Sequence, residues 1–204
     1  MEQKHRNCGL CGEKSCESFF EKVKNKNKSM EECPFNNLAT QKTVDLKESI
    51  NVETDSNGDK FDFILEAISG EPSARKIVRP FRTDLIEKLN IHKGCYIMGR
   101  PTGAGCPVTH VLKVYDIDEL SGLLYTWAVG PKFSREFEAK NIGSYTMVGF
   151  EGIAKYINNY PSIGKKASFL PGFCMIRLSH HGLVNKLLNT SEGLVVRIED
   201  IHIA

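Results

Sequence analysis

Residues 44–68 read VDLKESINVETDSNGDKFDFILEAI, and this stretch sets the expected fold of most of the chain. Apolar and polar residues alternate on both sides of Asn57-Gly58, and this is the period of a half-buried strand. An Asn-Gly dipeptide accepts the positive φ angles of a tight hairpin turn. The stretch therefore predicts two strands joined at this turn, and the second strand would present one apolar face made of Phe61, Phe63, Leu65 and Ala67.

The rest of the chain continues with short apolar runs separated by turn residues. A short helix is expected at residues 83–89, with Leu85, Ile86 and Leu89 facing inward. Further strands are expected at residues 95–99, 110–117, 123–129, 144–148, 167–178 and 194–201. The pattern predicts an α+β chain that is mostly β, with a small helical module followed by an antiparallel β-barrel-like domain. We expect the module to span residues 1–36, a connector residues 37–42 and the β-rich domain residues 43–204.

Four cysteines in the N-terminal segment indicate a metal site: Cys8, Cys11, Cys16 and Cys33, the last followed by Pro34. Thiolates are soft donors that bind Zn²⁺ or iron–sulfur clusters. Structural zinc sites usually contain two closely spaced cysteine pairs, whereas here three cysteines fall within nine residues and the fourth is distant. This spacing favours an iron–sulfur cluster. Zinc, and thiols that are free or disulfide-bonded, are the alternatives.

A short helix is expected at residues 15–24, because Ser15 can cap it and apolar residues recur at spacings of three and four. The side that carries Cys16, Phe19, Phe20 and Val23 would face the cluster. Four lysines then follow at every second position, and they form either a solvated loop or a docking patch for an acidic redox partner: Lys22, Lys24, Lys26 and Lys28.

The run CGLCGEKSCESFFEKV at residues 8–23, followed by ECPF at residues 32–35, resembles a small [4Fe–4S] domain. That domain occurs at the N-terminus of the large subunit of the corrinoid iron–sulfur protein and in the B subunit of Rnf electron-transport complexes. The resemblance covers about residues 4–36. It implies a [4Fe–4S] cluster as cofactor, covered by Phe19 or Phe20 and ligated by Cys8, Cys11, Cys16 and Cys33. The chain departs from the family at residues 22–32, KVKNKNKSMEE, which are richer in Lys and Asn.

A second candidate site lies in MGRPTGAGCPVTHVLKV, residues 98–114. Glycines let backbone amides approach a ligand, and the side chains offer donors, a thiol and an imidazole, so a cofactor or substrate site is expected around Arg100, Gly103, Cys106 and His110. No nucleotide-binding motif is present, because neither GxxxxGK[ST] nor GxGxxG before a helix occurs. The alternative is a tight loop with a buried cysteine and a hydrogen-bonded histidine.

A second metal site would also be possible if the fold brought together Cys95, Cys106, Cys174, His110 and His180. Adjacent His180 and His181 would point to opposite faces of a strand, so at most one of them would join such a site.

Net charge and hydropathy argue against nucleic acid and membrane as partners of the chain. The net charge is +2, with 10 basic against 11 acidic residues up to residue 60 and 17 against 14 beyond it. Neither part is strongly basic, so nucleic acid is not an expected partner. The chain contains no run of eighteen apolar residues, and we expect a cytoplasmic protein without membrane insertion. A low-potential cluster is sensitive to oxygen, so an anaerobic host is expected.

These features suggest two main functional classes for the chain. The first is an electron-transfer protein that docks on a larger redox enzyme complex; the resemblance suggests methanogenic or acetogenic one-carbon metabolism. The second is a small redox enzyme with a substrate or cofactor in the β domain near Arg100, Cys106 and His110. A structural or assembly subunit, in which the cluster only stabilises the N-terminal fold, is a third possibility.

Overall fold

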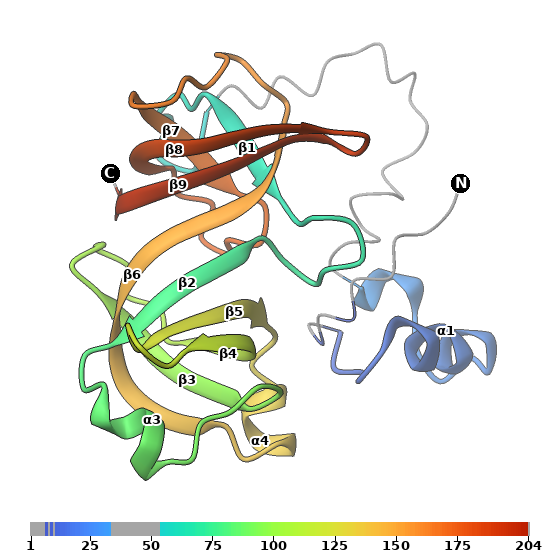
Figure 1. Cartoon of the computed structure of the whole chain (residues 1–204). Coiled ribbons are helices and arrows are strands. Elements are labelled where there is room, and N and C mark those ends of the chain that lie inside the picture. The colour runs from blue at the N-terminus through green and yellow to red at the C-terminus, as the bar shows by residue number, and fades with distance from the viewer. Residues whose placement is uncertain (1–6, 8, 10, 34–53, 204) are drawn as a thin grey trace.

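The computed structural model of the chain describes residues 7, 9, 11–33 and 54–203 (Figure 1). The N-terminal part contains α1 (Cys16–Lys24) and the 3₁₀ helix η1 (Met30–Glu32). Two short helices, α3 (Asp84–Lys88) and α4 (Phe133–Glu136), lie between strands. The strands are β1 (Phe63–Glu66), β2 (Arg75–Pro80), β3 (Tyr96–Thr102), β4 (His110–Asp118), β5 (Leu123–Val129), β6 (Lys140–Lys155), β7 (Lys166–Pro171), β8 (His180–Thr190) and β9 (Gly193–Ile203).

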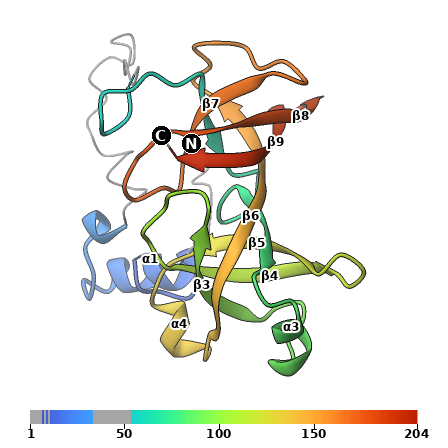
Figure 2. The ribbon, with the colours of Figure 1, turned by 90° about the vertical axis from the view of Figure 1, so that its left-hand side faces the viewer.

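The strands form one sheet in the order β1-β7-β8-β9-β6-β2-β5-β4-β3, and β6 also pairs with β1 and β3. These extra pairings close the sheet into two rings that share β6. Figures 1 and 2 show one ring, made by β2, β3, β4 and β5, beside a second made by β1, β7, β8 and β9, with β6 running through both. Most pairs are antiparallel, while β1–β7 and β3–β6 are parallel. The expected mostly β, barrel-like architecture is confirmed.

One apolar core runs through both rings. Phe63, Phe169 and Val196 fill it in one ring, and Leu112 and Leu124 fill it in the other. All five side chains are fully buried. Because inward-facing residues alternate with outward-facing ones along each strand, the interior is lined by apolar side chains, and a polar side chain that points inward is exceptional.

The predicted helices are confirmed. Ser15 caps α1, since its Oγ accepts a hydrogen bond from the backbone N–H of Ser18 at 3.1 Å. Phe19 on this helix is buried. Helix α3 matches the helix expected at residues 83–89, and its expected inward residues pack against the core: Leu85, Ile86 and Leu89.

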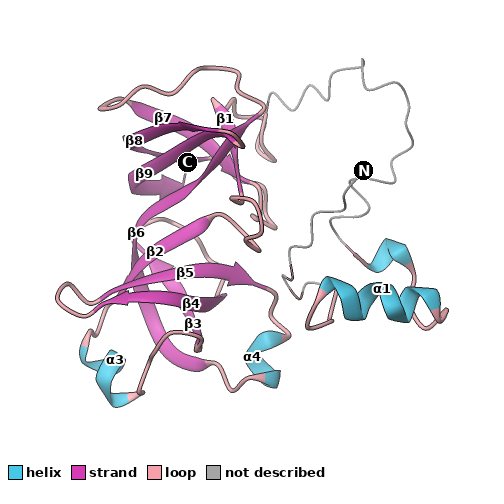
Figure 3. Ribbon diagram, turned by 45° about the vertical axis from the view of Figure 1, so that its right-hand side comes forward, coloured by secondary structure: helices cyan, strands magenta, loops and turns pink. Residues whose placement is uncertain are grey.

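The strand predictions are partly correct. Thr54 pairs with Lys60 in an isolated bridge around Gly58, whose φ is 89°, so the expected turn exists, but residues 43–53 of the first predicted strand lie outside the described residues. The strand expected at 144–148 extends over all of β6, and the one expected at 167–178 ends at Pro171. Strands β2 and β8 were not predicted. The helices and strands are distinguished in Figure 3.

No helix within the described part of the chain has both the length and the apolar character needed to cross a membrane.

Candidate metal centre and interior cavity

The N-terminal loop holds three of the four cysteines predicted to be ligands. Cys11 lies in a turn, Cys16 begins α1 and Cys33 follows η1. Asn7 fixes the loop to the helix, because its Oδ1 accepts a hydrogen bond from the backbone N–H of Cys16 at 2.7 Å and its own N–H donates to the Cys16 Sγ at 3.4 Å. Cys8, the fourth predicted ligand, lies outside the described residues.

The three thiols are close enough to influence one another. Partial burial raises the pKa of the Cys11 thiol, and the nearby sulfurs of Cys33 and Cys16 raise this pKa further. Three neighbouring thiolates repel one another unless a cation lies among them, and a metal ion or cluster provides that cation. The donor set therefore fits a thiolate-bound metal centre. Within residues 7, 9, 11–33 and 54–203, however, no three Cys, His, Asp or Glu side chains are placed closely enough to complete a metal site by themselves.

Two of the four lysines of the predicted docking patch are bound within the module. Lys28 donates a hydrogen bond to the Cys11 carbonyl oxygen at 2.6 Å and lies 3.3 Å from the buried carboxylate of Glu13. Lys22 also contacts Glu13, at 2.8 Å. Lys24 and Lys26 are exposed and have no ion-pair partner among the described residues. Lys28 thus places a positive charge beside Cys11, one of the predicted ligands.

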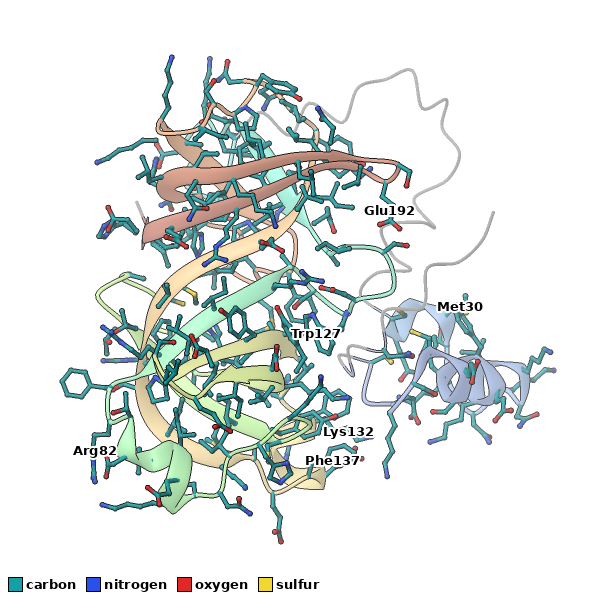
Figure 4. The ribbon with its side chains drawn as sticks, in the orientation of Figure 1. Met30, Arg82, Trp127, Lys132, Phe137 and Glu192 are labelled. Carbon is teal, nitrogen blue, oxygen red and sulfur yellow. The ribbon has the colours of Figure 1, made fainter. Side chains whose placement is uncertain are left out.

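The cysteine loop packs against α4 of the β domain. Gly9 has a φ of +74°, and a Cβ at this position would lie 1.7 Å from Cε2 of Phe133. Lys14 adds a cation–π contact, with its Nζ 5.5 Å from the ring centroid of Phe137. Figure 4 shows Lys132 and Phe137 on the side of the β domain that faces the helical part carrying Met30. The absence of a side chain at Gly9 is therefore required by the contact with Phe133.

Stacked aromatic rings lie beneath this contact. Tyr96 stacks on Phe133 with ring centroids 5.3 Å apart and on Phe137 with centroids 4.7 Å apart. Phe133 also belongs to a buried cluster with Val111 and Val129. These two valines also line a cavity of the β domain, whose lining includes the exposed Met175. Phe133 and these valines therefore lie between the cysteine loop and the cavity.

The cavity has a volume of about 90 Å³ and lies where β2, β5 and β6 meet the start of β8. Most of its walls are apolar. The exception is Lys76, which points inward from β2, is 8% exposed, and has no hydrogen-bond acceptor or ion-pair partner for its Nζ among the described residues. Its ammonium lies 5.3 Å from the ring centroid of Phe150. Burial lowers the pKa of Lys76 to about 8, although the sulfurs of Cys174 and Cys106 act in the opposite direction.

Two histidines share the cavity with this lysine. The Nδ1 of His110 lies 2.6 Å from the hydroxyl of the buried Tyr145, and its Nε2 lies 3.7 Å from the Sγ of Cys106. The positive charge of Lys76, together with burial, lowers the pKa of His110 to about 2. Burial and Lys76 likewise lower the pKa of His180 to about 4, against the effect of its hydrogen bond to a backbone carbonyl. Both imidazoles are therefore neutral at physiological pH.

Comparison with known proteins places the N-terminal site in an iron–sulfur family. The family described as "Putative Fe-S cluster" matches residues 5–35. A protein of Methanocaldococcus jannaschii, named "Uncharacterized protein MJ0119", is 32% identical over 212 aligned positions, which cover 97% of this chain and 88% of the relative. The chain belongs to the family of this archaeal protein. No solved structure matches the chain. The alignment with this relative spans both the cysteine segment and the β domain of the chain, and the match at residues 5–35 supports an iron–sulfur protein.

The structure separates the residues predicted for the second site. Cys106 and His110 line the cavity and contact each other. Arg100 is exposed on β3, and Gly103 is exposed in the following loop; neither lines the cavity. Of the residues considered for a second metal site, the cavity wall contains Cys106, Cys174, His110 and His180 but not Cys95. His181 is exposed while His180 is buried, as their alternation on a strand predicts.

Lys76 and Tyr145 were missed by sequence reasoning. Lys76 stands in the short run Lys76-Ile77-Val78, where an apolar residue would be usual at a buried strand position. A lysine inside such a run is the signal that could have identified it. Tyr145 is not distinguishable from an ordinary core aromatic by sequence, since its role depends on His110 from another strand.

Proposed function

We propose that this chain is a cytoplasmic iron–sulfur protein that transfers electrons, with one [4Fe–4S] cluster held by Cys8, Cys11, Cys16 and Cys33. The observation that carries the proposal is the iron–sulfur family match at residues 5–35, where three of these thiols lie near one another. When bound, such a cluster accepts and donates one electron at a time. Its acceptor or donor would be a protein partner or a larger enzyme complex, in line with the resemblance to the corrinoid iron–sulfur and Rnf modules; nucleic acid and membrane insertion are not part of the proposal.

The chain's own residues would support such a cluster in two ways. Lys28 places its ammonium beside Cys11 and offsets part of the negative charge that four thiolates bring. Gly9 lets the loop pack directly against Phe133, which excludes water from one side of the loop. Burial and nearby charge are among the factors that set the potential of a cluster.

The setting we propose is anaerobic one-carbon metabolism. It rests on the resemblance of residues 8–23 and 32–35, and it agrees with the archaeal source of the relative.

A decisive test is anaerobic purification of the full chain, followed by iron, sulfide and zinc analysis and by EPR spectroscopy after reduction. Four irons and four sulfides per chain, with an EPR signal that appears on reduction and disappears on reoxidation, are expected. Cys16→Ser should remove this signal, and Cys106→Ser should leave it unchanged, because Cys106 lies in the cavity and not in the cysteine loop. Zinc without iron would contradict the proposal, and a cluster that cannot be reduced would favour a purely structural role.

A redox enzyme is the second candidate, and the interior cavity favours it. Phe133, which contacts Gly9 of the cysteine loop, packs with Val111 and Val129, and these two valines line the cavity. A small molecule in the cavity would therefore be near the cluster. Electron transfer from the cluster to a compound bound in the cavity would support this candidate, and it should be lost in Cys16→Ser.

A further inference from the structure

The described polar side chains that line the cavity include an amine, imidazoles and thiols, but no carboxylic acid, the group that is ordinarily charged at neutral pH. Lys76 contributes an amine, His110 and His180 contribute imidazoles, and Cys106 and Cys174 contribute thiols. None of the described residues that line the cavity carries a carboxylate. A buried ammonium without a counterion is strongly unfavourable, so this arrangement favours an anionic ligand.

The geometry around Lys76 is that of a built site. Its strand position is fixed, because β2 pairs with β5 and β6 on either side and its carbonyl oxygen accepts a hydrogen bond from Thr126 Oγ1 at 2.9 Å. Its Nζ contacts the face of the Phe150 ring, and the ring of His180 packs edge-on against the same phenylalanine with centroids 5.8 Å apart. The amine is thus held at one place in the wall and directed into the cavity.

The size and polarity of the cavity select the kind of anion. Its volume of about 90 Å³ is several times the roughly 10–15 Å³ that a cavity needs to hold one water, so a molecule of a few heavy atoms can enter. A dianion such as phosphate would bring two charges against one ammonium, into walls that are mostly apolar, at a high desolvation cost. A small monoanion with a short hydrocarbon part matches both the single positive charge and the apolar wall.

We propose that the cavity binds a small aliphatic carboxylate whose carboxylate pairs with Lys76 and whose hydrocarbon part packs on the apolar wall. His110 is held by Tyr145, and its other ring nitrogen faces the Cys106 thiol, so it fixes one side of the site. His180 is positioned by its hydrogen bond to the Leu178 carbonyl oxygen at 2.9 Å and borders the other side. This site requires only the β domain, so the proposal does not depend on whether the cluster transfers electrons.

The test uses the full chain with its cluster oxidised and sodium propionate as the probe. Calorimetric titration is compared with propionamide, which has a similar shape without the charge, and with phosphate, at constant ionic strength. Saturable binding of propionate is expected, with little or no binding of propionamide or phosphate. Equal binding of propionamide, preference for phosphate, or no binding of propionate would each overturn the proposal.

Two lysine variants test whether propionate binds at Lys76. Lys76→Met keeps the length and volume of the side chain and removes the charge, so the affinity for propionate should fall by about 30-fold or more. Lys166→Met, at an exposed lysine on β7, is the matched control and should leave the affinity unchanged. Propionate binding retained by Lys76→Met would overturn the proposal.

NMR spectroscopy of the unmutated chain is a second test, and it does not depend on whether a variant folds. The ring NMR signals of His110 and His180 should shift saturably as propionate is added, because both rings line the cavity. Those of the exposed His92 and His202 should stay in place. Binding that shifts only the exposed rings would place propionate on the surface and contradict the assignment.

Discussion

Gly9 packs so closely on Phe133 that a Cβ would lie 1.7 Å from the ring carbon Cε2. This contact joins two parts of the chain that are more than a hundred residues apart in sequence. It couples the conformation of the cysteine loop to α4, and through the rings beneath α4 to the cavity. Variants in the cysteine loop, at Lys28 and inside the β domain test this arrangement separately.

Gly9→Ala should displace the cysteine loop, and Gly12 offers a matched control. Both glycines have a positive φ, 74° and 81°, so an alanine costs about 1–2 kcal/mol of backbone strain at either position. Only at Gly9 does the new Cβ meet a buried ring; at Gly12 the nearest atom is Cδ of the flexible Lys132, at 3.5 Å. Iron retained after anaerobic gel filtration should be clearly lower for Gly9→Ala. Equal loss in both variants would show that backbone strain, and not the contact with Phe133, matters.

Adding Phe133→Ala to Gly9→Ala should restore part of the iron binding, because the double variant removes the clash. Phe133→Ala alone should lower the free energy of unfolding by about 3–5 kcal/mol, since the ring is buried. Both variants are compared by iron analysis and urea unfolding. Independent, additive effects of the two changes would argue against direct coupling between these residues.

Lys28→Met should lower the reduction potential of the cluster. Reduction adds one negative charge, and a neighbouring ammonium stabilises the reduced state, so its removal makes reduction less favourable. We expect a shift on the order of 60 mV, the value that corresponds to a tenfold change in the one-electron equilibrium. An anaerobic redox titration followed by EPR measures it. Lys24→Met, an exposed lysine on the same segment, should leave the potential within error; a potential unchanged in both variants would mean that Lys28 does not act on the cluster.

The free energy of unfolding should depend on pH through Lys76. Its pKa is about 8 in the folded chain, below the usual 10.5, because the ammonium is buried. Below pH 8 both states carry the proton and the folded state bears the full cost of the buried charge. Between about pH 8 and pH 10.5 the unfolded state binds more protons, so stability rises with pH.

Lys76→Met should therefore be more stable than wild type at pH 7, by on the order of 3 kcal/mol. This advantage should shrink as pH rises above 8. Urea unfolding at several pH values without carboxylate measures it. The other titratable groups that face Lys76 are Cys106, Cys174, His110 and His180. An advantage that does not change with pH would show that Lys76 is not the titrating group.

Tyr145→Phe should destabilise the β domain by removing the partner of His110 Nδ1. The pair is buried, with 2.6 Å between the hydroxyl oxygen and the nitrogen, and an unsatisfied buried nitrogen costs about 1–3 kcal/mol. Tyr96→Phe is the control, because the Tyr96 hydroxyl makes no hydrogen bond within the described part of the chain. Chemical unfolding of both variants gives the difference. A cost as small for Tyr145→Phe as for Tyr96→Phe would mean that the hydrogen bond adds nothing.

The sequence predicts those helices and strands that depend on local features, such as capping residues, hydrophobic spacing and turns. Helix α1 has a capping serine and a regular apolar spacing, and β4 and β5 are short alternating runs between turns. The missed elements are those that tertiary structure decides. Strand β2 carries Lys76 toward the interior, which breaks the alternation, and β6 passes from one ring to the other, so its buried face changes along its length.

Of the two candidate sites, the cysteine set could be predicted from local sequence, whereas most of the cavity depends on tertiary structure. The cysteine set lies in one short segment, and its spacing alone indicates the chemistry. The cavity is assembled from residues on several strands. Spacing in the sequence indicated Cys106 and His110, which are four residues apart, but not Lys76, which lies near them only through the pairing of β2 with β5 and β6.

The strand shared by both rings also bears on how the β domain loses its structure. Strand β6 pairs with β2 and β3 in one ring and with β1 and β9 in the other, and one core continues across it. Neither ring can open without exposing apolar side chains of its neighbour, so neither is an independent folding unit. Heating should accordingly produce one cooperative transition for the whole β domain, whose calorimetric and van't Hoff enthalpies agree.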